Sequence, residues 1–393
     1  LGRLCSAIGE VGGNIGALDG FDVRGTELRR SLVVHCRDEA HQQKVVEAVK
    51  ALRGVTLMDW WDRTFRMHEA GKIQTGTLAP VNDRDDLSMA YTPGVARVCM
   101  SIHDDPALSH EYTIRKNTVA IVSNGTAVLG LGDIGPEAAM PVMEGKAMLF
   151  KEFGGVDGFP VCINARTADE VVDFVQRIAP TFGGINLEDI KAPECFEIEE
   201  RLKASLDIPV FHDDQHGTAV VALAALWNSL KITGKKMEDL SVVIAGIGAA
   251  GVAIGKILIN AGVGEIVGCD RTGAVYSGRG DLNSAKEWFA ANTNPTRKMG
   301  TIGEVLRGAD VFIGVSGPDL ITAADVRPAN LTAVVFDNGV YAGACSLGAI
   351  TPGACSIISN GYSVGNHVIV ATYQGDTNHT GSTAAPFTQV ISQ

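Results

Sequence analysis

Hydrophobic positions near the N-terminus follow two spacings. The first run has the three- and four-residue spacing of an amphipathic helix: Leu1, Leu4, Cys5, Ile8 and Val11. The glycines of "GGNIG" end this pattern, and two short strand-like runs follow, the second being "SLVVHC". A second helix is predicted over Glu39–Leu52, ending at Gly54 ahead of the strand-like "VTLMDWW". Residues 1–70 therefore predict a small ferredoxin-like α+β domain, a βαββαβ unit without its first strand.

This N-terminal pattern resembles the ACT regulatory domain, whose members often bind a small metabolite between subunits. The resemblance places a small-metabolite effector near Gly13 and Asn14. A packing or dimerisation module without any ligand is the alternative, because one βαββαβ fold serves many roles.

Strands and helices alternate from about Gly71 to Leu206. Ile208–Phe211 then has the pattern of a short buried strand, and Gly217 opens an apolar helical run, "TAVVALAALWNSL". We predict an α/β substrate- and metal-binding domain over residues 71–215. The stretch "GLGDIG", Gly130–Gly135, is formally G-x-G-x-x-G, but Pro136 follows it at once, so we expect it to shape the floor of the site instead of binding a nucleotide.

The pattern of a dinucleotide-binding unit lies between Leu240 and Asp270. A buried strand runs into Gly246-x-Gly248-x-x-Gly251, a helix follows, and a second strand ends at Asp270. Glycines there let the backbone approach a pyrophosphate at a helix N-terminus, and the acidic residue can accept a hydrogen bond from the ribose 2′-hydroxyl. A Rossmann-type domain over residues 216–327 is predicted, with NAD favoured as cofactor; the neighbouring Arg271 leaves NADP open.

Three further residues complete the predicted cofactor site. "ADVFIGVSGP" has the pattern of a later Rossmann strand and loop, which places Gly314 and Ser316 near the nicotinamide. Thr218, at the start of the apolar helical run, is the third candidate.

The last predicted segment, residues 328–393, has a different composition. It contains no Lys, Arg or Glu, and its only acidic residues are Asp337 and Asp376. Short β-branched runs between Gly, Ser and Asn predict a β-rich segment, to which we assign no function.

Composition restricts the class of function. The chain has 393 residues, 46% of them hydrophobic, which is enough for two or three domains. A formal net charge of −12 argues against nucleic acid or an anionic membrane as partner. The eight cysteines form no C-x-x-C pair, no apolar run is long enough to span a membrane, and no signal peptide begins the sequence, so we expect a cytoplasmic protein.

Two separate stretches carry clustered carboxylates. "FGGINLEDIKAP" contributes Glu188 and Asp189, and "FHDDQHGTA" contributes Asp213 and Asp214. Carboxylates that converge on one cleft repel one another unless a cation neutralises them, and an all-oxygen set favours Mg²⁺ or Mn²⁺. Solvated turns or helix N-caps are the alternative for each stretch taken alone.

Two histidines in the second stretch, His212 and His216, have the four-residue spacing of a zinc-protease helix. Because the predicted strand and helix place them on either side of a turn, zinc binding is disfavoured.

Taken together, these motifs resemble the bacterial malic enzymes. The resemblance runs from about Gly71 to Asp325 and rests on "AYTPGVA", "NGTAVLGLGDIGP", "PVMEGKA", "PTFGGINLEDI", "FHDDQHGTA", the Gly246 glycine motif and "GADVFIGVSGP". It implies oxidative decarboxylation of (S)-malate to pyruvate and CO2 by an NAD-dependent homodimer or larger oligomer.

The resemblance also implies a role for each matching residue. Lys146 would be the general base, oriented by Asp213, and its pKa would be lowered by desolvation and the metal. Tyr91 would protonate C3. Glu188, Asp189 and Asp214 would bind the divalent ion. His212 and His216 would be loop residues that support the site.

The resemblance stops after about Asp325, where the family's "ANPTPE" and "PNQ.NN" motifs are absent. Asn338 and Asn366 lie near the expected positions but are not assigned. Two other functions therefore remain: a metal-independent amino-acid dehydrogenase, and a catalytically impaired regulator that binds nucleotide and metabolite.

Overall fold

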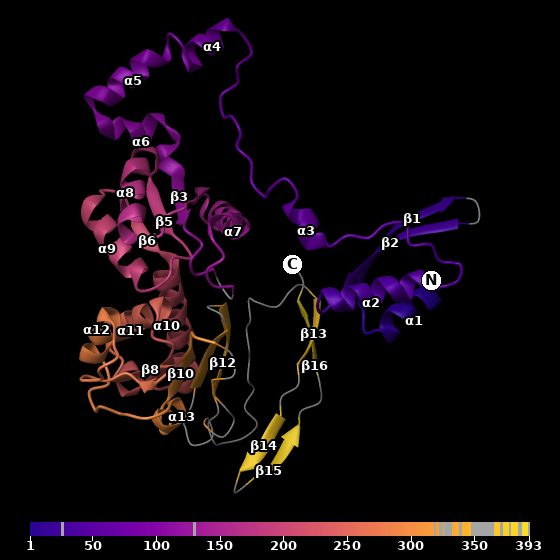
Figure 1. Ribbon diagram of the computed structural model, residues 1–393, viewed down its shortest axis with the longest axis vertical. Coiled ribbons are helices and arrows are strands. Elements are labelled where there is room, and N and C mark those ends of the chain that lie inside the picture. Colours follow the sequence, from indigo (N-terminus) through magenta and orange to yellow (C-terminus); the bar gives the residue numbers. More distant parts are fainter. Residues whose placement is uncertain are drawn as a thin grey trace. The chain divides into compact units, whose positions relative to one another are not determined.

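The computed structural model describes residues 1–24, 27–128, 131–317, 320–321 and 325, and six strands between residues 332 and 391. Gly130 and Asn338 lie outside the described residues. The chain divides into two compact units, one formed by Leu1–Glu69 and Tyr362–Gln393 and the other by Ala70–Gly361 (Figure 1). Among the described helices, none combines the length and apolarity needed to cross a membrane.

Residues 2–50 of the first unit form helices on either side of a β-hairpin. Helix α1 (Gly2–Glu10) is followed by β1 (Asn14–Arg24), its antiparallel partner β2 (Glu27–His35) and α2 (Glu39–Lys50). A small core contains the buried side chains Ile8, Val45 and Val49. The predicted helices and strand pair are confirmed.

The predicted third strand, "VTLMDWW", is wrong, because the segment before α3 (Arg63–His68) has no regular structure. Val55 and Leu57 do pack against the core, whereas Trp60 and Trp61 are exposed. Alternating burial of this kind mimics a strand in the sequence, but the segment forms no backbone ladder with β1 or β2.

The described parts of the C-terminal segment are strands. β13 (Gly365–Ile369) pairs antiparallel with β16 (Phe387–Ile391), and β14 (Thr372–Asp376) pairs with β15 (His379–Thr383). The prediction of a β-rich segment is confirmed for these residues. Asn366 lies in β13.

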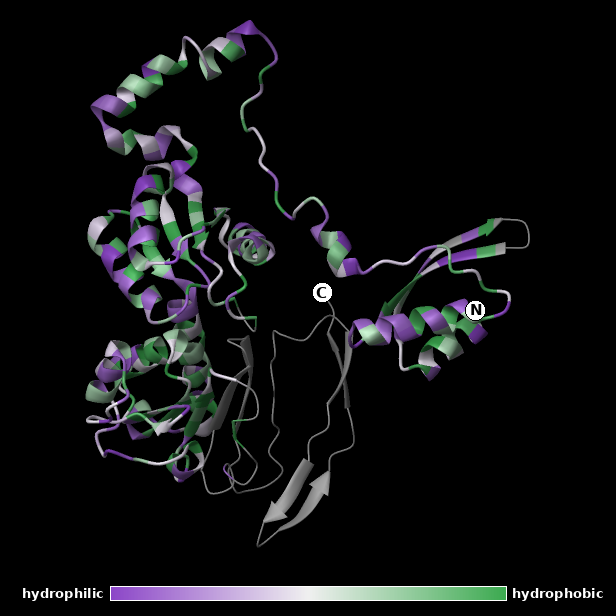
Figure 2. Ribbon diagram, viewed as in Figure 1, coloured by the Kyte–Doolittle hydropathy of each residue, from purple (hydrophilic) through white to green (hydrophobic). Residues whose placement is uncertain are grey.

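The larger unit begins with short helices that bury none of their residues: α4 (Arg84–Ala90), α5 (Val95–Asp104), η1 (Pro106–Leu108), α6 (Ser109–Tyr112) and η2 (Ile114–Asn117). Hydrophobic and hydrophilic residues alternate along α4 and α5 (Figure 2).

A parallel four-stranded sheet of order β4-β3-β5-β6 follows. Its strands are β3 (Thr118–Ser123), β4 (Asp157–Cys162), β5 (Gly184–Leu187) and β6 (Val210–His212). The connecting helices are α7 (Pro136–Gly154), α8 (Ala168–Ile178), with η3 (Ala179–Thr181) after it, and α9 (Glu194–Ser205). The chain leaves β3 for β4 on one side and returns to β5 on the other. Ligands of open α/β sheets bind at the carboxyl ends of strands where the order reverses in this way.

Helix α10 (Asp213–Thr233) links this sheet to the next domain. It begins at Asp213, so the helix start predicted at Gly217 is wrong by one turn. Two acidic residues in the first turn, Asp213 and Asp214, favour the earlier start because they interact well with the helix dipole.

The second domain has a six-stranded sheet of order β12-β11-β10-β7-β8-β9. After η4 (Met237–Asp239), it comprises β7 (Ser241–Ala245), β8 (Glu265–Asp270), β9 (Gly273–Ala274), β10 (Val311–Gly314), β11 (Thr332–Asp337) and β12 (Val340–Ser346), with helices α11 (Ala249–Asn260), α12 (Ser284–Asn292) and α13 (Ile302–Val305). β8, β7, β10 and β11 run parallel, which confirms the predicted Rossmann-type architecture.

Phe289 on α12 holds α11 against the sheet. Its side chain is fully buried, and its ring lies where side chains on Gly255 of α11 and Gly268 of β8 would have to go, 2.4 and 2.5 Å from ideal Cβ positions. The two glycines therefore make room for the ring, which fills the gap between helix and sheet.

Phe289→Ala is expected to lower the free energy of unfolding by about 3–5 kcal/mol, because it removes a ring from a tightly packed core. Trp288→Ala, at the neighbouring position where the side chain is 37% exposed, serves as control and should cost about 1 kcal/mol or less. Urea denaturation followed by circular dichroism measures both. Equal losses would contradict the assignment of Phe289 to the core.

Candidate active site

Three carboxylates meet at the carboxyl end of β5. Glu188 and Asp189 follow this strand, and Asp214 lies in the first turn of α10. Glu188 and Asp189 are 5% and 3% exposed, and one oxygen from each of the three groups lies within 4.8 Å of the others. Asp189 has a φ of 52°, and its backbone N–H donates to Asp214 Oδ2 over 3.1 Å. The left-handed backbone thus ties the β5 loop to the start of α10.

Lys146 reaches this cluster from α7. Its Nζ lies 2.5 Å from Asp213 Oδ2 and 3.0 Å from Glu188 Oε1, and its side chain is 20% exposed. Burial acts to lower the pKa of Lys146, but the charges of Glu188 and Asp213 outweigh burial and raise it above the usual value of 10.5. The sequence-based expectation of a lowered pKa rested on desolvation together with a bound metal ion. Here the two carboxylates outweigh desolvation, and the effect of a metal ion stays a prediction.

Burial dominates the ionisation of Glu188. It raises the pKa of this carboxyl to about 8; the nearby Lys146 and an amide hydrogen bond from Asn186 oppose it, and Asp214 reinforces it. Burial likewise raises the pKa of Asp214. Buried acids that resist losing their protons are stabilised as carboxylates by a bound cation. Three oxygen donors this close together suit a hard divalent ion such as Mg²⁺ or Mn²⁺.

The two histidines lie in regular elements and not in a loop. His212 ends β6 with its ring fully buried, and its Nε2 lies 3.4 Å from Asp214 Oδ2. His216 lies in α10, with Nε2 2.7 Å from Glu199 Oε1. Among the described residues, the group of potential metal ligands at this site contains neither histidine.

Glu199 on α9 was missed by the sequence analysis. Its Oε1 accepts hydrogen bonds from the backbone N–H of His212, from Lys203 Nζ and from the His216 ring. The carboxyl is buried, which alone would raise its pKa, but these hydrogen bonds lower the pKa to about 2. Glu199 therefore anchors the β6–α10 turn that carries Asp213 and Asp214. Only its spacing from Lys203 is visible in the sequence, and that spacing is common on helix surfaces.

Glu199→Gln is expected to lower the free energy of unfolding at pH 7 by about 2 kcal/mol, because charged hydrogen bonds are lost. The pKa of Glu199 falls from 4.5 to about 2 on folding, so the stabilisation is full above pH 4.5 and disappears as pH falls through 2. The difference between the variant and the parent, measured by urea denaturation, should shrink over that range.

Glu197→Gln is the matched control, because Glu197 lies on the same helix with a side chain 58% exposed and pairs with Arg201, one turn further along that helix. If the loss of unfolding free energy in Glu199→Gln does not change with pH, the charge of Glu199 does not stabilise the turn as described.

Tyr91 lies apart from these contacts. It caps the C-terminal end of α4, its side chain is 69% exposed, and it forms no hydrogen bond with Lys146, Glu188 or Asp214. Its predicted role as a proton donor stays a prediction.

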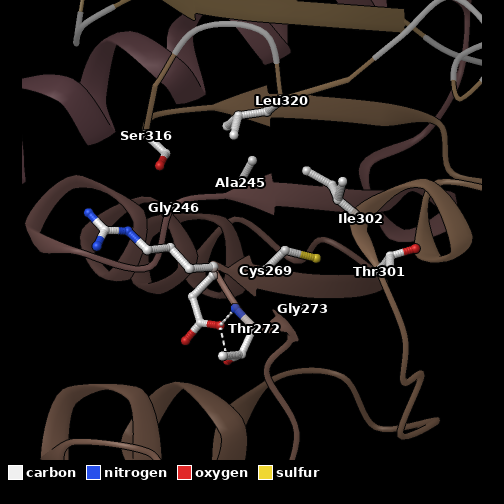
Figure 3. A pocket seen from close by; sticks show the side chains of 11 residues that line it. Ala245, Gly246, Cys269, Thr272, Gly273, Thr301, Ile302, Ser316 and Leu320 are labelled. Atoms are coloured by element: carbon white, nitrogen blue, oxygen red, sulfur yellow. Dashed lines mark hydrogen bonds between the residues drawn. The ribbon is translucent and has the colours of Figure 1, made fainter.

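A second part of the site lies at the carboxyl ends of β7 and β8, where a cavity of about 270 Å³ opens. The residues that line it are Ala245, Gly246, Cys269, Asp270, Arg271, Thr272, Gly273, Thr301, Ile302, Ser316 and Leu320. Figure 3 shows the side chains of Ser316, Leu320 and Ile302 arranged around it. Of the predicted cofactor residues, Gly246, Asp270 and Ser316 thus share one cavity.

The other predicted cofactor residues do not line this cavity. Gly248 and Gly251 lie at the start of α11, Gly314 ends β10 beside Ala245 of β7, and Thr218 lies in α10.

The glycines at the start of α11 are required for two different reasons. A Cβ on Gly251 would lie 1.9 Å from the carbonyl oxygen of Gly246, so the turn itself excludes a side chain. A Cβ on Gly248 would meet nothing within 4 Å, and its φ of −102° suits any residue. Open space beside the N-terminus of a helix is what a coenzyme pyrophosphate needs, so these residues fit a dinucleotide.

Gly248→Ala should therefore fold with a Tm close to that of the parent but bind NADH at least about tenfold more weakly, because the methyl group occupies the place of the phosphates. Gly251→Ala should lose stability instead. NADH fluorescence titration and thermal denaturation separate the two effects. Unchanged NADH affinity in Gly248→Ala would contradict the proposed position of the pyrophosphate.

Comparison with known proteins gives a consistent result. A model of the malic enzyme N-terminal domain matches residues 70–203, and one of the malic enzyme NAD binding domain matches residues 215–330. Residues 1–69 lie outside both matches, so the ACT-like interpretation stays a prediction.

Individual relatives are named as malic enzymes too. An NAD-dependent malic enzyme of Geobacillus stearothermophilus is 54% identical over 333 residues, which cover 85% of this chain and 70% of that protein. An NADP-dependent malic enzyme of Haemophilus influenzae is 48% identical over 260 residues, 65% of this chain but only 34% of that longer protein. The crystal structure of an NAD-dependent malic enzyme from Thermotoga maritima matches with a TM-score of 0.68 and 46% identity, covering 70% of this chain and 74% of that one.

Proposed function

This chain belongs to the malic enzyme family, and from that premise we propose that it converts (S)-malate to pyruvate and CO2, reducing NAD with the help of Mg²⁺ or Mn²⁺. The observation that carries the proposal is the group of three carboxylates, buried Glu188 and Asp189 with half-buried Asp214, one of which, Glu188, pairs with Lys146. The Rossmann-type domain on the same unit supports NAD as the hydride acceptor.

Glu188, Asp189 and Asp214 would hold the divalent ion. When bound, the ion supplies Lewis acidity: it withdraws electrons from the substrate's C2 oxygen and balances the charge of the carboxylates. The three ligands come from two elements that the Asp189–Asp214 hydrogen bond fixes to each other, so their spacing is set before any ligand arrives.

Lys146 would remove the proton from the malate C2 hydroxyl as hydride leaves C2. A lysine serves as a base only when neutral, and here Glu188 and Asp213 favour its charged form. Glu188 is also one of the proposed metal ligands, so engaging it with a cation weakens its pull on Lys146. Asp213, bonded to Nζ, orients the amine.

Tyr91 would return a proton to C3 after CO2 leaves. The family motif "AYTPGVA" and the exposed hydroxyl-bearing side chain support this role. The effector site near Gly13 and Asn14, a homodimer or larger assembly, and a cytoplasmic location are further proposals that rest on the sequence.

Lys146→Ala is expected to lower kcat for malate oxidation by about 10²–10⁴, the usual contribution of general base catalysis, while NADH binding is retained. Lys151→Ala is the matched control, since Lys151 lies on the same helix in an exposed pair with Asp157. Turnover is measured with malate, NAD and Mn²⁺ by absorbance at the NADH band together with CO2 release, and chelation of the metal should abolish it.

Two results would favour the rivals. Oxidation of an amino acid without added metal would favour the dehydrogenase. A parent protein as inactive as Lys146→Ala, yet still able to bind NADH, would favour the regulator. The three-carboxylate cluster argues against the first rival, which needs no such set.

A further inference from the structure

Asp270, the residue expected to accept the ribose 2′-hydroxyl, already has a full set of hydrogen-bond donors. Its Oδ1 accepts from the backbone N–H and the hydroxyl of Thr272, at 3.0 and 2.8 Å. Its Oδ2 accepts from Arg279 Nη2 and, over 2.6 Å, from Lys286 Nζ. A carboxylate offers about four lone-pair sites, so these four bonds leave no acceptor for a ribose hydroxyl.

The two cations are held firmly on Asp270. Arg279 is only 10% exposed; its Nη1 donates to the carbonyl oxygens of Gly273 and Ala274, and its Nε donates to Asp281 over 2.6 Å. Lys286 lies in the first turn of α12, and its side chain is 23% exposed. Burial acts against the charge of Asp270, but the hydrogen bonds prevail and hold its pKa below the usual value. The carboxylate therefore stays charged and stays paired.

The cluster around Asp270 carries no net negative charge, unlike an isolated acid. Two carboxylates, Asp270 and Asp281, face the two cations Arg279 and Lys286, so the hydrogen-bonded cluster is formally neutral. Arg271 is exposed, lines the same cavity and has no ion-pair or hydrogen-bond partner among the described residues. A phosphate entering this cavity would meet a neutral wall and a positive side chain.

We propose that the Arg279–Asp270–Lys286 ion cluster sets the coenzyme preference of this chain, by withdrawing Asp270 from the ribose and leaving Arg271 to face a 2′-phosphate, so that the site binds NADP as well as NAD. This rests on the proposed function only through the position of the coenzyme in the cavity. It assigns Arg279 and Lys286 as specificity-determining residues, whereas the sequence pattern alone pointed to Asp270 as an NAD-selecting acid.

The first test compares the dissociation constants of NADH and NADPH for the intact chain, by fluorescence titration without malate. The two dissociation constants are expected to lie within about tenfold of each other. The site has neither a free acceptor for the ribose 2′-hydroxyl of NADH nor a net negative charge that would repel the 2′-phosphate of NADPH. A site that hydrogen-bonds a hydroxyl through an unpaired group discriminates by about 10⁴-fold. A preference for NADH of that size would overturn the proposal.

The second test frees Asp270. Lys286→Met keeps the length of the side chain but removes one donor and one positive charge, so it should shift the ratio of the two dissociation constants towards NADH by at least about tenfold. Lys298→Met is the matched control: Lys298 Nζ also pairs over 2.6 Å with a carboxylate of β8, but that carboxylate is Glu265 at the opposite end of the strand. An unchanged ratio in Lys286→Met, or an equal shift in the control, would overturn the proposal.

Arg271→Gln provides an independent variant, because the side chain is exposed and has no ion-pair or hydrogen-bond partner among the described residues. It should weaken NADPH binding at least about fivefold more than NADH binding; equal effects on both coenzymes would contradict the role of Arg271. Both measurements record binding alone. A chain that binds coenzyme as proposed but does not oxidise malate would refute the proposed function and leave this inference standing. Selective binding of NADH by a chain that does oxidise malate would refute this inference and leave the proposed function standing.

Discussion

The structure of the candidate site depends on one constraint: four carboxylates, two of them paired with the half-buried Lys146, lie close together after β5 and β6. Lys146 contacts Asp213 and Glu188, while Glu188, Asp189 and Asp214 lie close enough to share an ion. Like charges in a buried space destabilise one another, so the elements that carry them must be fixed from outside. The Asp189–Asp214 hydrogen bond and the anchor Glu199 provide this, and α10 continues from the cluster into the packing of the coenzyme domain.

Much of the fold could be predicted from local pattern. Buried strands such as "GINL" and "SVVIA" and the glycine turn after β7 have clear sequence signals. Two predictions failed where tertiary context decided the structure. The segment "VTLMDWW" alternates like a strand but forms no ladder with β1 or β2, and α10 starts one turn early because Asp213 and Asp214 stabilise its first turn.

The positions of the site residues could be predicted as far as the ends of the strands could be predicted. Because β5 and β6 are neighbouring parallel strands, the acidic residues that follow them must lie close together. Local pattern did not reveal the partners: Glu199 beneath the β6–α10 turn, Arg279 and Lys286 on Asp270, and Glu188 on Lys146. Only the family resemblance pointed to Asp213 as a partner of Lys146. Each partner lies nine or more residues away along the chain, so no local spacing marks the contact.

The most direct test of this account is Mn²⁺ binding to the coenzyme-free protein, followed by electron paramagnetic resonance. The account predicts one tightly bound ion per chain, lost in Asp189→Asn and retained in Asp133→Asn, whose carboxylate is 52% exposed and pairs with Arg166. If Mn²⁺ does not bind, or if Asp189→Asn binds it as well as the parent does, the carboxylate cluster is not a metal site and the proposed reaction loses its basis.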